Sequence, residues 1–247
     1  MKRMIIMGAS SGIGLAAARA LASRGVRVGL AARRLAPLEE LKTLYPDNVE
    51  IAEIDVNSPD APARLRELID RLGGMEIYFH VAGIGYDNPD FTPEREVEIL
   101  ETNSVGFARM TCAAYGWFRE HGNGGHIAAV TSVGGTNGVG DLSAYSASKK
   151  CAQTYLTALE QLSRSRRDNI AITDIRPGWI TTPLLHADKR YPMAMTLEYA
   201  LPQILRAVVE RRRVAYIDCR WGILAAAWRL LPNCLWTRMR IPVDFPK

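Results

Sequence analysis

The stretch KRMIIMGASSGIGLAAARALASRGVRVGLAA, residues 2–32, decides the predicted fold. Apolar segments at residues 2–7 and 26–32 predict two β-strands, and the Ala-rich segment between them predicts a helix that ends at Gly25. The turn from the first strand into this helix carries three glycines at G-x-x-x-G-x-G spacing, namely Gly8, Gly12 and Gly14. A glycine-rich backbone before a helix N-terminus favours phosphate binding. Such turns also serve tight packing alone, and this spacing differs from the G-x-G-x-x-G dinucleotide fingerprint.

Strands and helices alternate along the rest of the chain. Five more strands are predicted, at residues 49–56, 75–81, 126–131, 170–175 and Val214–Ile217. Helices are predicted at residues 35–45, 59–72, 92–102 and 106–121, and another runs through Tyr145. This alternation predicts an α/β protein with a mainly parallel sheet of about seven strands and helices on both faces. Ligands of such sheets lie at the carboxyl ends of the strands, where the chain places Gly8, Arg33, Asp55, Ala82, Ser132 and Pro177.

Length and composition narrow the class of protein. A chain of 247 residues can bury one substantial core, and no linker or repeat divides it, so one domain is expected. The net charge of +5 suits phosphate-bearing ligands or an anionic surface, but no nucleic-acid-binding motif is present. The cysteines lack C-x-x-C spacing, so no metal site is predicted and a cytoplasmic location is expected; they are Cys112, Cys151, Cys219 and Cys234. No apolar segment has the length of a signal-peptide core or a membrane span.

A second stretch, TSVGGTNGVGDLSAYSASK at residues 131–149, carries candidate chemistry. Tyr145 and Lys149 are four residues apart on a predicted helix, so their side chains share one face. A neighbouring ammonium favours the phenolate, and Ser132 could hydrogen-bond the oxygen of a substrate. These groups suit proton transfer to a carbonyl or from an alcohol, which needs a redox cofactor. By itself, such a pair more often reflects packing and a solvated charge.

Taken together, the motifs resemble those of a classical short-chain dehydrogenase/reductase over most of the chain. They are GASSGIG at residues 8–14, Ala82-Gly83, Asn103, Ser132, Y-S-A-S-K at residues 145–149 and Pro177-Gly178. The resemblance implies a single-domain Rossmann fold with a doubly wound sheet. It also implies that Tyr145 is the general acid/base, that Lys149 lowers its pKa and holds the nicotinamide ribose, and that Ser132 positions the substrate oxygen. Asn103 would complete this catalytic tetrad by supporting a proton-relay water.

The end of the second strand indicates which dinucleotide is bound. It reads Ala31-Ala32-Arg33-Arg34, with no carboxylate for a ribose 2′-hydroxyl. Arg33, with Arg34 or Ser10 nearby, could hold a 2′-phosphate, so NADP(H) is expected over NAD(H). The alternative is that both are solvated surface arginines. The residues expected at the cofactor are Gly8, Ser10, Ser11, Gly12, Ile13, Gly14, Arg33, Arg34, Asp55, Val56, Ala82, Gly83, Asn103, Tyr145, Lys149, Pro177, Gly178, Ile180 and Thr182.

Two positions depart from the family pattern. His80-Val81 stands where the family usually has Asn-Asn, and we expect His80 to be a strand-end hydrogen-bonding substitute rather than a catalytic base. Pro202 lies where the helix after the substrate loop should be, so that helix should begin near Pro202 or kink there. Either change would reshape the cover of the substrate site.

The last third of the chain should set the substrate. We expect a catalytic domain at residues 1–217 that includes a substrate loop at residues 182–199, followed by a tail at residues 218–247. The loop contributes Leu184, Leu185, Tyr191, Met193 and Met195, which favour a hydrophobic ligand, although Lys189 and Arg190 leave an anionic one open. The tail combines Trp221, Trp228 and Trp236 with Arg220, Arg229, Arg238 and Arg240. Packing of the tail over the pocket or against another subunit is favoured over contact with a membrane surface.

These features predict an NADPH-dependent oxidoreductase that interconverts a hydrophobic, lipid-like ketone or aldehyde and its alcohol. The alternative is a regulatory protein that keeps the fold and binds NADP without turnover. The complete set of four catalytic residues argues against that alternative, because a sensor has no need of all four. Family members are most often dimers or tetramers, so the resemblance implies a homodimer or homotetramer.

Overall fold

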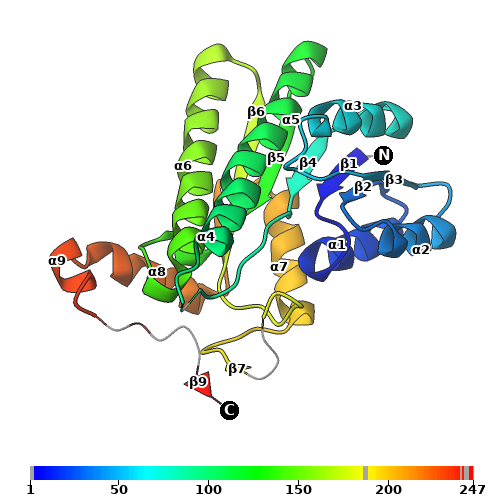
Figure 1. The fold of residues 1–247 in the computed structure, drawn as a ribbon. Helices are drawn as coiled ribbons and strands as arrows, with labels where there is room; N and C mark the ends of the chain where they lie inside the picture. The colour runs from blue at the N-terminus through cyan, green and yellow to red at the C-terminus, as the bar shows by residue number, and fades with distance from the viewer. Residues whose placement is uncertain (1–2, 89, 186–188, 240, 242–244, 247) are drawn as a thin grey trace.

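A computed structural model describes residues 3–88, 90–185, 189–239, 241 and 245–246. Seven strands form one sheet in the order β3-β2-β1-β4-β5-β6-β8, and every neighbouring pair is parallel (Figure 1). The strands are β1 (Arg3–Met7), β2 (Arg27–Ala32), β3 (Val49–Glu53), β4 (Ile77–His80), β5 (Gly125–Val130), β6 (Ile170–Pro177) and β8 (Val214–Ile217). This order is that of the doubly wound Rossmann fold, as predicted.

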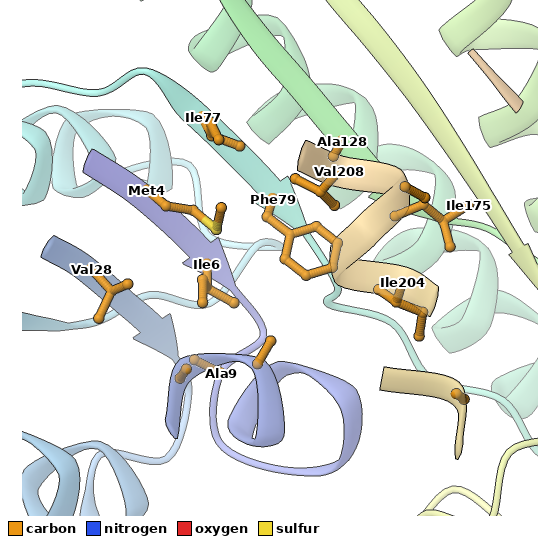
Figure 2. Packing of buried hydrophobic residues seen from close by; sticks show 14 of the residues in the cluster. Met4, Ile6, Ala9, Val28, Ile77, Phe79, Ala128, Ile175, Ile204 and Val208 are labelled. Carbon is orange, nitrogen blue, oxygen red and sulfur yellow. The ribbon is translucent and has the colours of Figure 1, made fainter. Parts of the chain in front are cut away.

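Helices cover both faces of the sheet. One face is covered by α1 (Gly12–Ala22), α2 (Ala36–Leu44) and α7 (Leu197–Val209), and the other by α3 (Ala61–Leu72), α5 (Phe107–His121) and α6 (Ser143–Arg166). Figure 2 shows the first core, in which Phe79 of β4 lies between Ile6 of β1 and Ile204 of α7. All three side chains are fully buried, because a parallel sheet that is covered on both faces has apolar residues on both.

The segment before α5 is more continuous than the sequence predicts. α4 (Pro93–Leu100) runs through a π-helical segment, η1 (Glu101–Gly106), directly into α5, so the expected break between two helices is absent from this described segment. π-Helical turns are rare and occur frequently at functional sites. Here the turn carries Asn103, which is buried.

Pro202 does not start its helix. α7 begins at Leu197, where the Thr196 hydroxyl accepts a hydrogen bond from the backbone N–H of Tyr199 at 3.3 Å, so the prediction of a start near Pro202 is wrong. The helix passes through Pro202, which cannot donate the bond that the carbonyl of Glu198 would otherwise receive. Buried Ala200 and Ile204 on either side pack against the sheet, and this packing holds the proline in helical conformation.

The C-terminal segment packs on the same domain. It forms α8 (Cys219–Leu230) and α9 (Asn233–Trp236), beside the N-terminal end of α6 (Figure 1). The Trp236 indole donates to the carbonyl of Gly138 at 2.6 Å, and the Asn137 amide donates to the carbonyl of Trp228 at 3.0 Å. Two short strands, β7 (Lys189–Arg190) and β9 (Phe245–Pro246), pair antiparallel and join the substrate loop to the C-terminal segment. Arg240 lies outside the described residues, and no helix among those described has the length and apolar character to cross a membrane.

Candidate active site

The glycine-rich turn brings three segments into close contact. A Cβ atom on Gly8 would lie 2.5 Å from the backbone nitrogen of Ala82, and one on Gly14 would lie 2.1 Å from the carbonyl oxygen of Gly8. Gly8 and Gly12 also adopt φ angles of 94° and 52°, which favour glycine. The turn after β1 therefore touches the turn after β4, and the N-terminus of α1 faces the space between them. This arrangement suits a phosphate group.

A single cavity of about 810 Å³ runs along the carboxyl ends of the strands. Its wall includes every residue predicted at the cofactor except Gly14, which packs beneath the turn, and Asn103, which lies behind Gly83. Arg33 and Arg34 follow the last residue of β2 and are exposed at the cavity wall. The Arg34 guanidinium lies 3.4 Å from the Ser10 hydroxyl. Asp55 and Tyr86 also line the wall. The glycine-rich turn and these two arginines along one cavity fit the phosphates of a nicotinamide dinucleotide.

Tyr145, Lys149 and Ser132 converge on the same cavity. Tyr145 lies in the first turn of α6, and the Lys149 Nζ, one turn later, is 5.6 Å from the centre of its ring. Ser132 follows β5, and its hydroxyl accepts from the Gly134 N–H at 3.0 Å. A Cβ on Gly134 would be 3.3 Å from that hydroxyl oxygen and 3.4 Å from the Tyr145 ring. The side chains of Ser132 and Tyr145 therefore both pack against Gly134.

Asn103 holds the loop beside this group. Its side-chain oxygen accepts from the Ile84 N–H at 2.9 Å, and its amide donates to the Ile84 carbonyl at 2.7 Å and to the Ser148 hydroxyl at 3.2 Å. A Cβ on Gly83 would be 3.1 Å from the Asn103 oxygen and 3.4 Å from Lys149 Nζ. Asn103 therefore fixes the turn after β4 against α6. Its role in a proton relay stays a prediction.

Burial shifts the pKa values of Tyr145 and Lys149. It raises the pKa of the Tyr145 phenol, and the hydrogen bond with Ser132 partly opposes that rise. Burial also lowers the pKa of Lys149 to about 8, against the attraction of Asp174. The phenol is thus protonated near neutral pH in the protein by itself, ready to donate. That Lys149 lowers the pKa of Tyr145 stays a prediction.

His80 ends β4 as a neutral hydrogen-bonding residue. Its ring is buried, with Nδ1 2.9 Å from the Tyr78 hydroxyl and the ring centre 5.0 Å from that of Phe107. Burial, with the positive charge of Lys149, lowers the pKa of His80 to about 3. A group that binds protons so weakly is a poor base near neutral pH. His80 forms a hydrogen bond as expected, but within its own strand.

Sequence reasoning missed a buried ion pair behind the predicted catalytic residues. Asp174 and Arg176 on β6 are 3% and 6% exposed, and the Arg176 Nε donates to Asp174 at 2.7 Å. The other Asp174 oxygen accepts from the Thr131 hydroxyl at 2.6 Å, and the Arg176 guanidinium lies 3.2 Å from the Tyr216 hydroxyl. Two charged residues alternating with apolar ones in a strand that ends in Pro-Gly were the available signal.

The side of the cavity where the substrate is predicted is mainly apolar. Four of the five loop residues predicted there line it, whereas Met195 does not: it is buried in the core, and its backbone pairs with that of Trp179. The Lys189 ammonium pairs with Asp87 at 2.6 Å. α8 contributes Trp221, Leu224 and Trp228 to the wall, so the tail packs over the cavity, which is one of the two arrangements that the sequence favours. The apolar and aromatic lining comprises Val139, Leu142, Trp179, Leu184, Leu185, Tyr191, Met193, Trp221, Leu224, Trp228 and Ile241.

Comparisons with known proteins agree with this geometry. The sequence profile of the short chain dehydrogenase family matches residues 2–191. An uncharacterized oxidoreductase of Myxococcus xanthus is 35% identical over 200 residues, which are 78% of each chain. One of Mycobacterium tuberculosis is 32% identical over an alignment of 248 residues, covering 96% of each chain.

Solved structures share the fold over nearly the whole length. A short chain dehydrogenase from Burkholderia cenocepacia in complex with NADP has a TM-score of 0.82 at 20% identity, covering 98% of this chain and all of that one. A 3-ketoacyl-(acyl-carrier-protein) reductase from Brucella melitensis, complexed with NADH, has a TM-score of 0.76 at 22% identity. The match covers 88% of this chain and 96% of that one. By its sequence profile, its relatives and its fold, the chain belongs to the classical short-chain dehydrogenase/reductase family and is an NAD(P)-dependent oxidoreductase.

Proposed function

We propose that the protein is an NADPH-dependent reductase that interconverts a hydrophobic ketone or aldehyde and its alcohol. The observation that carries this proposal is a single cavity lined at one end by Arg33 and at the other by Tyr145, Ser132 and an apolar wall. A nucleotide phosphate and a carbonyl group can therefore occupy one continuous space.

The side chains divide the work of the reaction. A bound nicotinamide dinucleotide supplies the hydride in reduction and accepts it in oxidation. The Tyr145 phenol donates its proton to the carbonyl oxygen as negative charge develops there, and takes it back in the reverse direction. The Ser132 hydroxyl already accepts a bond from Gly134, so its own hydrogen can turn from Tyr145, or from the Pro177 carbonyl at 3.5 Å, to the substrate oxygen. The Lys149 ammonium favours the phenolate that remains after proton transfer.

The preference for NADPH rests on the two arginines after β2. Both lie at the cavity wall without a carboxylate at the end of that strand, and a guanidinium can hold a phosphate through two parallel hydrogen bonds. Solved structures of this fold include one complex with NADP and one with NADH, so the fold by itself does not determine which dinucleotide is preferred. One solved structure of this fold is an NADPH-dependent 3-quinuclidinone reductase from Rhodotorula rubra. Its TM-score is 0.75 at 22% identity, and the match covers 90% of this chain and 91% of that one.

The lining supports an uncharged, largely apolar substrate. The rings of Trp179 and Tyr191 are tilted by 44° with their centres 4.9 Å apart, and both line the cavity. The Lys189 ammonium at this end is paired with Asp87, which weakens the case for an anionic substrate. Aromatic walls stabilise flat or ring-containing apolar ligands through large contact areas.

The test is loss of NADPH absorbance with a panel of hydrophobic ketones and aldehydes, run beside the Tyr145→Phe variant and repeated with NADH. We expect turnover that prefers NADPH and falls by roughly 10²–10⁴-fold in the variant, because a positioned acid is removed. Unchanged turnover in Tyr145→Phe would refute the assigned acid. Tight NADPH binding by both proteins without turnover of any compound would favour the regulatory alternative.

We also propose that the protein is a homo-oligomer, as the family resemblance implies. Val97, Leu100 and Val105, on α4 and η1, are 50%, 39% and 53% exposed, an apolar surface suited to a second subunit. Light scattering coupled to size-exclusion chromatography checks this, and a monomer at all concentrations contradicts it.

A further inference from the structure

We propose that the outer surface of α8 and α9 binds anionic lipid membranes. α8 is apolar on two opposite faces. Its inner face carries Trp221, Leu224 and Trp228, which line the cavity, and buried Ala225. A helix at the surface of a soluble protein normally has polar residues on its other face.

The outer face of α8 is apolar as well. Ile223 and Leu230 are 71% and 84% exposed, and exposed Ala226 and Ala227 lie between them at i, i+3, i+4 and i+7 spacing. Leu230 is the most exposed large apolar side chain among the residues described. A continuous helical stripe of this kind is the signature of a surface that is covered by something else.

Exposed apolar residues continue beyond α8. Leu235 on α9 and Met239 after it are 50% and 49% exposed. The inner side of α9 is anchored to the domain, because Trp236 is buried and donates its indole hydrogen to the carbonyl of Gly138. The apolar residues are therefore held outward on a rigid support.

The charge of this segment selects its partner. Residues 219–239 contain three arginines and no aspartate or glutamate. Arg220 pairs with Asp218 at 2.6 Å, whereas Arg229 and Arg238 are exposed and neither pairs with a carboxylate within the described ranges. Basic residues beside exposed aliphatic ones are what an anionic bilayer surface attracts.

A second copy of the chain fits this surface less well. A symmetric interface would bring the same patch of two subunits together, and with it their arginines, without carboxylates from the segment to pair them. Phosphate headgroups supply that negative charge, and the acyl region accepts the aliphatic side chains. The membrane would then lie against the back of the helix whose front lines the cavity, close to where an apolar substrate dissolves. The binding itself does not depend on the catalytic proposal.

Co-sedimentation of the full-length protein with vesicles tests the proposal. The vesicles are phosphatidylcholine alone or mixed with phosphatidylglycerol, at low and high salt. We expect binding to the mixed vesicles that weakens in high salt. The double variant Ile223→Glu/Leu230→Glu should bind at least about tenfold more weakly, because two apolar contacts are lost and two like charges are added. Arg229→Gln and Arg238→Gln should each weaken binding about fivefold.

Leu44→Glu is the matched control. Leu44 is a 63% exposed leucine on α2, outside the segment, so this variant should bind vesicles like the unmodified protein. Circular dichroism and NADPH binding show that each variant is folded. Absence of vesicle binding, or equal binding by the double variant, overturns the proposal. A concentration-dependent oligomer that the double variant abolishes, without vesicle binding, overturns it in favour of self-association.

Discussion

His80 should make the stability of the protein depend on pH in the acidic range. Its pKa falls from 6.5 in the unfolded chain to about 3 in the folded protein, because the ring is buried and Lys149 is nearby. Between these values the unfolded chain binds a proton that the folded protein does not. The contribution of His80 to the free energy of unfolding is therefore fully present above about pH 6.5. Below that pH it decreases by about 1.4 kcal/mol per pH unit, because the unfolded chain binds one more proton than the folded protein.

The expected magnitude follows from these two values. Lowering the pH from 8 to 5 should reduce the free energy of unfolding by about 2 kcal/mol through His80 alone. The variant His80→Asn keeps a hydrogen-bonding group next to Tyr78 but cannot titrate in this range. Urea unfolding at pH 8 and pH 5 measures the change for each protein, and groups other than His80 cancel in the comparison.

We expect His80→Asn to lose about 2 kcal/mol less stability on acidification than the unmodified protein does. Equal losses in the two proteins would refute the reasoning, because they would mean that His80 titrates alike in the folded and unfolded states.

Three further changes probe the site. Gly85→Ala places a methyl group 2.6 Å from the Tyr145 ring, so kcat should fall by about 10²-fold in steady-state assays while thermal stability stays close to normal; a normal kcat contradicts this. Asp174→Asn leaves Arg176 buried without a carboxylate, and urea unfolding should show a loss of about 3–5 kcal/mol; a loss below about 1 kcal/mol would contradict the importance of the pair. Arg33→Asp should lower the preference for NADPH over NADH, measured as the ratio of kcat/KM values, by on the order of 10²-fold; an unchanged ratio removes Arg33 from the cofactor site.

The sequence predicted the positions of residues that lie at the end of a strand or on one face of a helix. Gly8 and Ser132 follow apolar strands, and the ends of parallel strands meet at one edge of a sheet, so the order of elements along the chain was enough to predict their convergence. Tyr145 and Lys149 share a helix face by spacing alone. The apolar strands themselves were visible as short hydrophobic runs.

Other features depend on contacts between distant segments. The Asp174–Arg176 pair is held by Thr131, which follows β5, and by Tyr216 from β8. Only the registers of three neighbouring strands bring these groups together. Pro202 breaks an isolated helix, but packing against the sheet overrides that local preference. The local sequence shows the charged residues and the proline, but not the distant partners that decide their structure.

The tail was ambiguous for a different reason. Because α8 is apolar around most of its circumference, its sequence does not indicate which face turns inward. The face is chosen by the shape of the cavity, into which Trp221 and Trp228 fit. The sequence therefore favoured packing over the pocket or against another subunit, but it could not choose between these two.

Trp221 lies directly against Gly178, where a Cβ atom would come within 2.0 Å of the indole ring. A side chain at position 178 would displace α8 from the sheet. A C-terminal segment without an indole at position 221 would leave a cavity beside the loop that follows β6. The C-terminal segment is therefore not an interchangeable module. A chimaera that takes this segment from another member of the family should recover activity only when position 178 and the residue that covers it come from the same parent.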